Sequence, residues 1–173
     1  MGAQFRVVPL ADTHDRAAFN CGVPALDRYL HQQVSQDMRR RVTSCFVAIT
    51  PDGQLAGFYT LASASVALSD LPATLAKKLP RYPLVPAVRM GRLAVAVAHH
   101  GVGLGAALLA NTLQRASQSD IAAYALVVDA KDAHAAAFYA HHGLQALPDA
   151  GRTLFMPLAS VKLLAKSGLQ VNV

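Results

Sequence analysis

The sequence contains no glutamate and no tryptophan, and only two of its 173 residues are cysteine. All ten acidic residues are therefore aspartate, which excludes any mechanism that needs a glutamate as its general base. Two cysteines do not form a disulfide framework, so we expect a reducing compartment, the cytoplasm. Only 15% of the residues are charged and 53% are hydrophobic, which predicts a folded chain, and the length favours one domain over residues 1–173.

The sequence also lacks an evident targeting or membrane segment. The N-terminal stretch MGAQFRVVPLAD has no apolar core of signal-peptide length. Residues 93–114 are uncharged and long enough to span a bilayer, but they include His99, His100 and a cluster of glycines. We interpret this segment as a strand, a glycine turn and a helix of a folded core, and we expect no membrane association.

Acidic residues are missing where cations gather. The formal net charge is +6, and no acid occurs between Asp70 and Asp120, a stretch that carries six lysines and arginines. The segment 38–51 is acid-free as well and contains three arginines. Such a basic excess indicates a polyanionic partner, which could be nucleic acid, an anionic membrane or a phosphate-rich cofactor. A solvated surface that only aids solubility is the alternative.

Hydrophobic periodicity and turn residues predict alternating strands and helices. The order is β-α-β-β-α-β-α-β-α-β, which is typical of an α/β or α+β domain with a mixed central sheet flanked by helices. The predicted strands are 4–9, 44–49, 55–68, 88–97, 124–130 and 153–156. The first predicted helix begins at Pro24 and ends near Arg39. The others cover 70–79, with Asp70 as N-cap, 103–117, 132–142 and, at the end, 160–166.

Residues 101–105 read GVGLG and join a predicted strand to a predicted helix. Such a turn leaves backbone N–H groups unpaired at the positive end of a helix, which is a cradle for a pyrophosphate. No Gly-Lys-Ser/Thr follows, so this is not a P-loop. A dinucleotide-binding fingerprint would need Gly-x-Gly-x-x-Gly and an acid about twenty residues on, a spacing that GVGLG does not have. A tight turn that only packs a helix on the sheet is the remaining alternative.

Two motifs resemble the GNAT family of N-acetyltransferases. Residues 100–105, HGVGLG, are similar to its acyl-CoA loop, Gln/Arg-x-x-Gly-x-Gly/Ala, with His100 at the first position. Residues 135–144, AAAFYAHHGL, are similar to its Ala-x-x-Phe-Tyr-x-x-x-Gly-Phe helix, with Leu144 replacing the last Phe and Asp132 standing where many members carry Asn. The resemblance implies the GNAT fold, acetyl-CoA as co-substrate and no metal. The cofactor-binding residues it implies are Leu93, Ala94, Val95, His100, Gly101, Val102, Gly103, Leu104, Gly105, Ala106, Asp132 and Phe138.

The resemblance narrows, over roughly residues 5–158, to the acetyltransferase toxins of bacterial type II toxin–antitoxin modules. The segments that carry it include FNCG at 19–22, LDRYL at 26–30, GFYTLA at 57–62, LPRYP at 79–83 and GRLAV at 91–95. It implies acetylation of the α-amino group of aminoacyl-tRNA, a block of translation, a ribbon-helix-helix antitoxin as partner and a homodimer. The residues we predict to bind RNA are Arg39, Arg40, Lys77, Lys78, Arg81, Arg89 and Arg92.

The same resemblance implies a direct attack of the amine on the thioester, with Tyr139 as general acid. An unperturbed tyrosine has a pKa of about 10, so its phenol is protonated at pH 7 and can protonate the leaving thiolate. A tyrosine that only packs its helix is the alternative reading. Asp129 is a weaker candidate for a general base, because it ends a predicted strand.

An aminoacyl ester lowers the pKa of its own α-amine and needs little help to lose its proton. The absence of glutamate therefore fits aminoacyl-tRNA better than a lysine or polyamine. Two other functions compete: an N-acetyltransferase for a small-molecule or protein amine, and a non-catalytic module that binds nucleic acid or acyl-CoA. The adjacent histidine pairs at 99–100 and 141–142 lack the i, i+4 spacing of a metal site, so no metal is expected.

Overall fold

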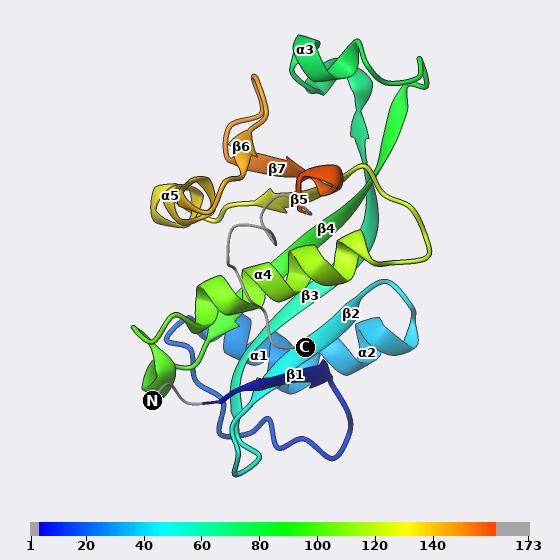
Figure 1. The fold of residues 1–173 in the computed structure, drawn as a ribbon. Coiled ribbons are helices and arrows are strands. Elements are labelled where there is room, and N and C mark those ends of the chain that lie inside the picture. Colours follow the sequence, from blue (N-terminus) through cyan, green and yellow to red (C-terminus); the bar gives the residue numbers. More distant parts are fainter. Residues whose placement is uncertain (1–3, 162–173) are drawn as a thin grey trace. The chain divides into compact units, whose positions relative to one another are not determined.

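The computed structural model describes residues 4–161 (Figure 1). These residues form two compact units. Unit 1 comprises the described residues up to 62 together with 91–112, and unit 2 comprises 63–90 and the described residues from 113 on. One domain over residues 1–173 stays a prediction.

Within the described part of the chain, seven strands form one sheet in the order β1-β2-β3-β4-β5-β7-β6. The β4–β5 pair is parallel and the β1–β2, β2–β3, β5–β7 and β6–β7 pairs are antiparallel, so the predicted mixed sheet is confirmed. The strands are β1 (Arg6–Pro9), β2 (Ser44–Ile49), β3 (Leu55–Ala67), β4 (Leu84–Val95), β5 (Ala125–Asp129), β6 (Gln145–Ala146) and β7 (Thr153–Pro157). The helices are α1 (Pro24–Gln32), α2 (Val34–Arg39), α3 (Ala73–Ala76), α4 (Leu104–Ser117) and α5 (Ala133–His141).

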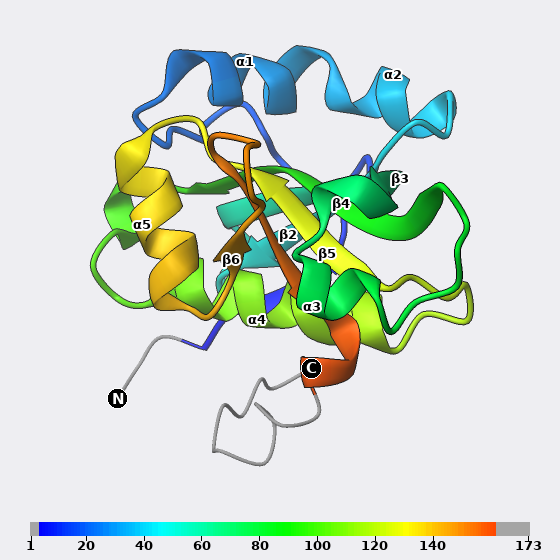
Figure 2. The same ribbon diagram turned by 90° about the horizontal axis from the view of Figure 1, so that it is seen from above.

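In unit 1, α1 and α2 cover one face of β2 and β3 and the first turns of α4 cover the other (Figure 2). Leu30 and Val34 are fully buried against Val47 and Phe58 of the strands. The prediction of one helix from Pro24 to near Arg39 is wrong in one respect. The backbone leaves the helical region at Gln33, with φ −120° and ψ −33°, and α2 starts anew after it.

Unit 2 contains β5, whose first four residues are all buried, and α5, which begins after Asp132. The helix predicted at 70–79 is shorter, and Asp70 is not its N-cap. Asp70 closes a 3₁₀ turn, Leu68–Asp70, and Pro72, which is extended at ψ 137°, precedes α3 instead. The two-residue strand β6 was not predicted, since so short a run shows no periodicity.

Two further boundaries differ from the predictions. β4 begins at Leu84 rather than Val88, because Pro86 lies near the strand's start, a place that tolerates proline. It ends at Val95, where a 3₁₀ turn follows. The helix predicted at 160–166 falls largely outside the described residues, and the described part holds a 3₁₀ turn at Leu158–Ser160. Within residues 4–161, no helix has the length and apolarity to cross a membrane.

Gly57 lets β3 approach the end of β4 and helix α4. A Cβ atom built on Gly57 would lie 2.9 Å from the Ala94 carbonyl oxygen and 2.9 Å from Cδ1 of Leu108. We expect Gly57→Ala to lower the free energy of unfolding by about 1–3 kcal/mol, the usual cost of overpacking a core. Urea unfolding monitored by circular dichroism measures this, and an unchanged midpoint would show that the strand yields at no cost.

Candidate active site

The loop between β4 and α4 has the backbone of an anion cradle. Gly101 and Gly103 have φ of 77° and 82°, which residues with a side chain rarely adopt. A Cβ atom built on either glycine would meet no described protein atom within 4 Å, so this side of the loop is open. Helix α4 begins directly after it, and its first N–H groups have no acceptor within the helix. The loop therefore offers donors to a phosphate.

His100 fixes the loop to the end of the strand. Its Nε2 lies 2.8 Å from the Val95 carbonyl oxygen, which can only accept, so Nε2 carries the donated proton. The Val97 amide donates to the Asn20 carbonyl oxygen at 2.8 Å and ties the 3₁₀ turn to the segment before α1. The histidine at the first motif position thus orders the backbone of the cradle. A direct contact between its side chain and CoA stays a prediction.

The strand end that precedes the loop is partly open. Ala94 is buried in the core of unit 1, whereas Leu93 and Val95 are half-buried. Beyond the loop, Leu104 is buried and anchors the start of α4, while Gly105 and Ala106 are half-buried and Val102 is exposed. The structure therefore brings the predicted cofactor residues of unit 1 into one continuous segment, from Leu93 to Ala106. The two other predicted cofactor residues, Asp132 and Phe138, belong to α5 in unit 2.

Tyr139 lies in α5 with only 9% of its surface exposed. Burial raises its pKa to about 12, so the phenol stays protonated through the neutral and mildly alkaline range. The ring of Phe138 packs edge-on against it, with ring centres 5.3 Å apart. Asp132 caps the helix, since its Oδ1 accepts from the Ala135 amide at 2.8 Å, and Gly143 ends it at φ 98°. The buried phenol can serve as a proton donor.

Asp129 is engaged on both carboxylate oxygens. One accepts from the Arg89 guanidinium and the other from the Thr153 hydroxyl at 2.7 Å. A carboxylate that already holds a cation and a hydroxyl is a poor proton acceptor, which argues against Asp129 as the general base. The same ion pair occupies Arg89, which weakens its predicted role in RNA binding.

The two cysteines belong to the core rather than to a reactive site. Cys21 and Cys45 are both buried and both free. Burial is the main cause that raises the pKa of the Cys21 thiol. It also raises the pKa of the Cys45 thiol, to about 12. Neither is therefore a thiolate nucleophile at neutral pH. Among residues 4–161, no three histidine, cysteine or aspartate side chains are grouped so that they could hold a metal ion.

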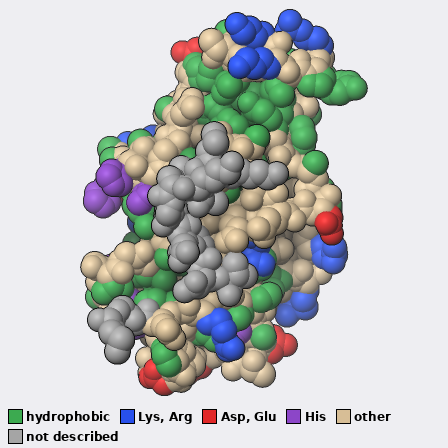
Figure 3. All heavy atoms as spheres, in the orientation of Figure 1, with side chains coloured by type: hydrophobic (Ala, Val, Ile, Leu, Met, Phe, Trp, Pro, Cys, Tyr) green, Lys and Arg blue, Asp and Glu red, His purple; other side chains and the backbone are tan. Residues whose placement is uncertain are grey.

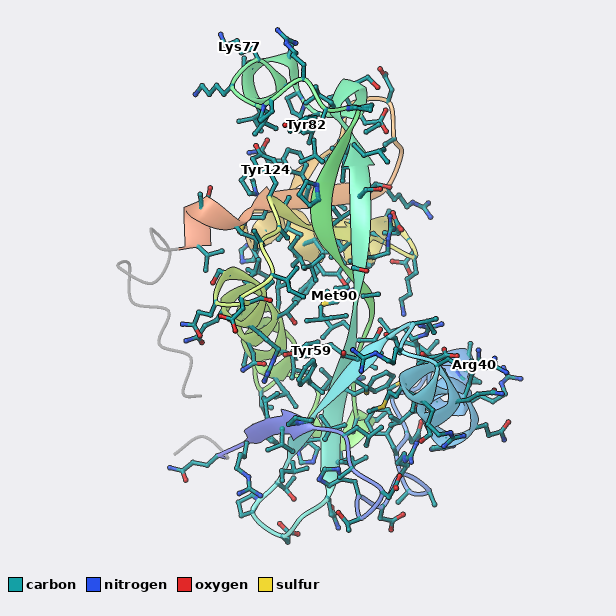
Figure 4. All side chains as sticks on the ribbon, turned by 90° about the vertical axis from the view of Figure 1, so that its right-hand side faces the viewer. Arg40, Tyr59, Lys77, Tyr82, Met90 and Tyr124 are labelled. Carbon is teal, nitrogen blue, oxygen red and sulfur yellow. The ribbon has the colours of Figure 1, made fainter. Side chains whose placement is uncertain are left out.

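The other predicted RNA-binding residues fall into three places. Arg39 and Arg40 are exposed at the end of α2 in unit 1 (Figure 4). Lys77, Lys78 and Arg81 are exposed between α3 and β4 in unit 2, where lysine and arginine side chains gather over α3 (Figure 3). Arg92 is half-buried on β4 in unit 1.

Sequence reasoning missed two residues beside Arg92. The Tyr29 ring of α1 lies under the Arg92 guanidinium, with 3.4 Å from Cζ to the ring centre. The Tyr29 hydroxyl donates to Oδ2 of Asp37 at 2.8 Å. Burial and this hydrogen bond raise the pKa of Tyr29 to about 12, although Arg92 opposes the rise. No spacing rule predicts this contact, because it joins two helices and a strand.

The family profile described as "Acetyltransferase (GNAT) domain" matches residues 11–152. The chain belongs to the GNAT acetyltransferase family. The predicted family, fold and class of enzyme, an acyltransferase, are thereby confirmed. The chain is 36% identical over 141 residues to the "tRNA-acetylating toxin" of Mycobacterium tuberculosis. The aligned residues cover 80% of this chain and 83% of that protein. It is 30% identical to the "Probable toxin TacT" of Sinorhizobium fredii, over 94% of this chain and 97% of that one.

Solved structures of GNAT toxins share the fold. AtaT complexed with acetyl-methionyl-tRNAfMet superposes with a TM-score of 0.86 at 29% identity, over 94% of this chain and 99% of that chain. AtaTR bound with AcCoA gives a TM-score of 0.80 at 27% identity, over 93% and 98%. A tyrosine-to-phenylalanine mutant of AtaT bound to the C-terminus of the antitoxin AtaR gives 0.77 at 26% identity, over 92% and 97%.

Proposed function

We propose that this GNAT enzyme transfers the acetyl group of acetyl-CoA to the α-amino group of aminoacyl-tRNA and thereby blocks translation. The observation that carries the proposal is the similarity over nearly the whole chain to AtaT, which was solved with acetyl-methionyl-tRNAfMet. The similarity to a tRNA-acetylating toxin supports it independently. The basic excess and the absence of glutamate fit an RNA that carries a weakly basic amine.

The open glycine cradle fits acetyl-CoA. The backbone N–H groups of residues 101–106 bind its pyrophosphate, and the strand end at 93–95, where Leu93 and Val95 are half-buried, lines the pantetheine arm and the acetyl group. Asp132, the N-cap of α5, and Phe138 of α5 stay predicted CoA contacts that rest on the family resemblance. The relative AtaTR was solved with AcCoA, which supports the assignment of the donor.

The reaction needs one nucleophile and one acid. The amine nitrogen bonds to the thioester carbon, the carbon–sulfur bond breaks, and the sulfur leaves as a thiolate that takes a proton from the Tyr139 phenol. The tyrosine is reprotonated from solvent, and the amine releases its own proton to water, because the aminoacyl ester makes it a weak base. No carboxylate is required for this step, which agrees with the occupied state of Asp129.

A toxin of this class is also expected to bind a protein partner, its antitoxin. AtaT binds the C-terminus of the antitoxin AtaR, and we extend to this chain an antitoxin of the ribbon-helix-helix type and a homodimeric state. The proposed substrate is aminoacylated in the cytoplasm, so that is where this enzyme acts. A small reading frame for such an antitoxin next to this gene would support the assignment.

Salt dependence separates an RNA substrate from a small amine. We expect log kcat/KM for aminoacyl-tRNA to fall linearly with log salt, and the Lys77→Gln/Lys78→Gln double variant to reduce that slope by about 1–2 because phosphate contacts are lost. Arg28→Gln is the matched control, because it removes an exposed cation from α1 and should leave the slope unchanged. A reaction insensitive to salt and to competing tRNA would favour a small-molecule or protein amine.

A further inference from the structure

Arg92 is an immobilised cation in unit 1. Its guanidinium lies flat against the Tyr29 ring, 3.4 Å from Cζ to the ring centre, and Tyr29 is only 5% exposed. The ring is held in turn, because the Tyr29 hydroxyl donates to Asp37 at 2.8 Å. A side chain that normally samples many rotamers is therefore restrained to one place before any ligand binds.

The N–H donors of this guanidinium remain available. Among the described residues, no carboxylate, carbonyl or hydroxyl oxygen accepts a hydrogen bond from Arg92, and its recorded contact is the tyrosine face. The Asp37 carboxylate contacts the stack through Tyr29, and its Oδ2 already accepts from the tyrosine hydroxyl. Arg16 carries a second positive charge in the same surroundings, since both arginines act on the buried Cys45 thiol. The guanidinium donors of Arg92 are therefore free to meet an anion.

The position of Arg92 defines which anion it meets. It immediately precedes the strand end at 93–95 that we assign to the acetyl group, and its stack on α1 places it on the α1–α2 face of β4. In an aminoacyl-tRNA, the charged group nearest the reacting amine is the phosphodiester 5′ to the terminal adenosine. A planar guanidinium with free donors recognises a phosphodiester by paired hydrogen bonds.

We propose that Arg92, oriented by Tyr29 and Asp37, is the receptor for a phosphodiester at the acceptor end of the RNA, next to the reacting amine. This inference rests on the proposed function and adds a residue that selects RNA-borne amines over free ones. Tyr29 and Asp37 are positioning residues, since they act through Arg92. The pyrophosphate of CoA is the other anion that Arg92 could bind, and the test separates it from the phosphodiester of the RNA.

Two short acceptors isolate the phosphodiester. One is adenosine esterified at its 3′-hydroxyl with the amino acid that the enzyme modifies in bulk aminoacyl-tRNA, and the other is the same ester of the dinucleotide CpA. We expect the native enzyme to prefer the CpA ester by about ten- to a hundred-fold in kcat/KM, the range of one charge-assisted hydrogen-bond pair. Arg92→Gln should abolish the preference and leave the adenosine ester and the Kd of acetyl-CoA unchanged, whereas Arg28→Gln, the control, should retain it.

The positioning role has its own readout. Tyr29→Phe keeps the aromatic face and should retain most of the CpA preference, whereas Tyr29→Leu removes the stack and should lose it. Circular dichroism confirms that each variant is folded. A merely structural tyrosine would instead lower the rate on both esters equally.

The outcomes separate this inference from the function on which it rests. If the native enzyme acetylates neither the esters nor aminoacyl-tRNA, the proposed function fails. If only full-length aminoacyl-tRNA is a substrate, its KM becomes the readout in place of the preference for the CpA ester. This KM should rise about ten-fold or more in Arg92→Gln and stay unchanged in Arg28→Gln. A CpA preference or KM that survives in Arg92→Gln, or a loss confined to acetyl-CoA affinity, overturns the assignment of Arg92.

Discussion

Tyr139→Phe should lower kcat by about 100- to 10,000-fold, the usual contribution of a general acid, and leave the affinity for acetyl-CoA nearly unchanged. The physical reason is that phenylalanine keeps the ring packed against Phe138 but cannot donate a proton to the leaving thiolate. Single-turnover acetylation of aminoacyl-tRNA measures the chemical step, and calorimetry measures the binding of acetyl-CoA.

The matched control is Tyr82→Phe, which removes a hydroxyl from a tyrosine that is 71% exposed in unit 2. It should leave kcat unchanged. The pKa of about 12 adds a second check, because the rate should show no loss from ionisation of Tyr139 through the mildly alkaline range. A Tyr139→Phe enzyme that retains most of its rate would make this residue a packing tyrosine and leave the acid unidentified.

Gly103→Ala should weaken acetyl-CoA binding by about ten-fold or more. The glycine has φ 82°, where a residue with a Cβ atom costs about 1–2 kcal/mol, and the added methyl group would stand in the open side of the cradle where the pyrophosphate approaches. Isothermal titration with acetyl-CoA measures the effect.

Gly53→Ala provides the control for backbone strain alone. Gly53 has φ 84°, and a Cβ atom there meets no described protein atom within 4 Å, but it lies in the turn between β2 and β3. Its substitution should cost stability without changing the Kd of acetyl-CoA. Equal affinities for Gly53→Ala and Gly103→Ala would contradict the assignment of the loop to the pyrophosphate.

Much of the fold could be predicted from the sequence, because local signals were strong there. The strand Ser44–Ile49 and the helix after the glycine loop follow from apolar runs and glycine punctuation. The break at Gln33 and the short α3 could not be predicted, since hydrophobic periodicity continues across both places and backbone angles decide them. The contacts that matter to the site lie beyond local pattern as well.

The residues of the candidate site also divide into those with a local signature in the sequence and those without one. A glycine at positive φ and a tyrosine in a helix motif leave signatures in the chain, so Gly101, Gly103 and Tyr139 could be proposed from it as site residues. The Tyr29–Asp37–Arg92 contacts and the Arg89–Asp129 ion pair join residues far apart in sequence. Charge counting alone grouped Arg89 with Arg92, whereas the structure shows one cation paired and the other with free donors.

The acceptor of the acetyl group can be identified with labelled acetyl-CoA. The purified protein is incubated with isotopically labelled acetyl-CoA and with total tRNA that is either aminoacylated or chemically deacylated, and the 3′-terminal nucleosides are analysed by mass spectrometry after nuclease digestion. We expect label on the α-amino group of aminoacyl-adenosine, none in the deacylated sample and almost none with Tyr139→Phe. Label that appears only on protein lysines or small amines, while the aminoacyl-adenosine stays unmodified, would contradict it.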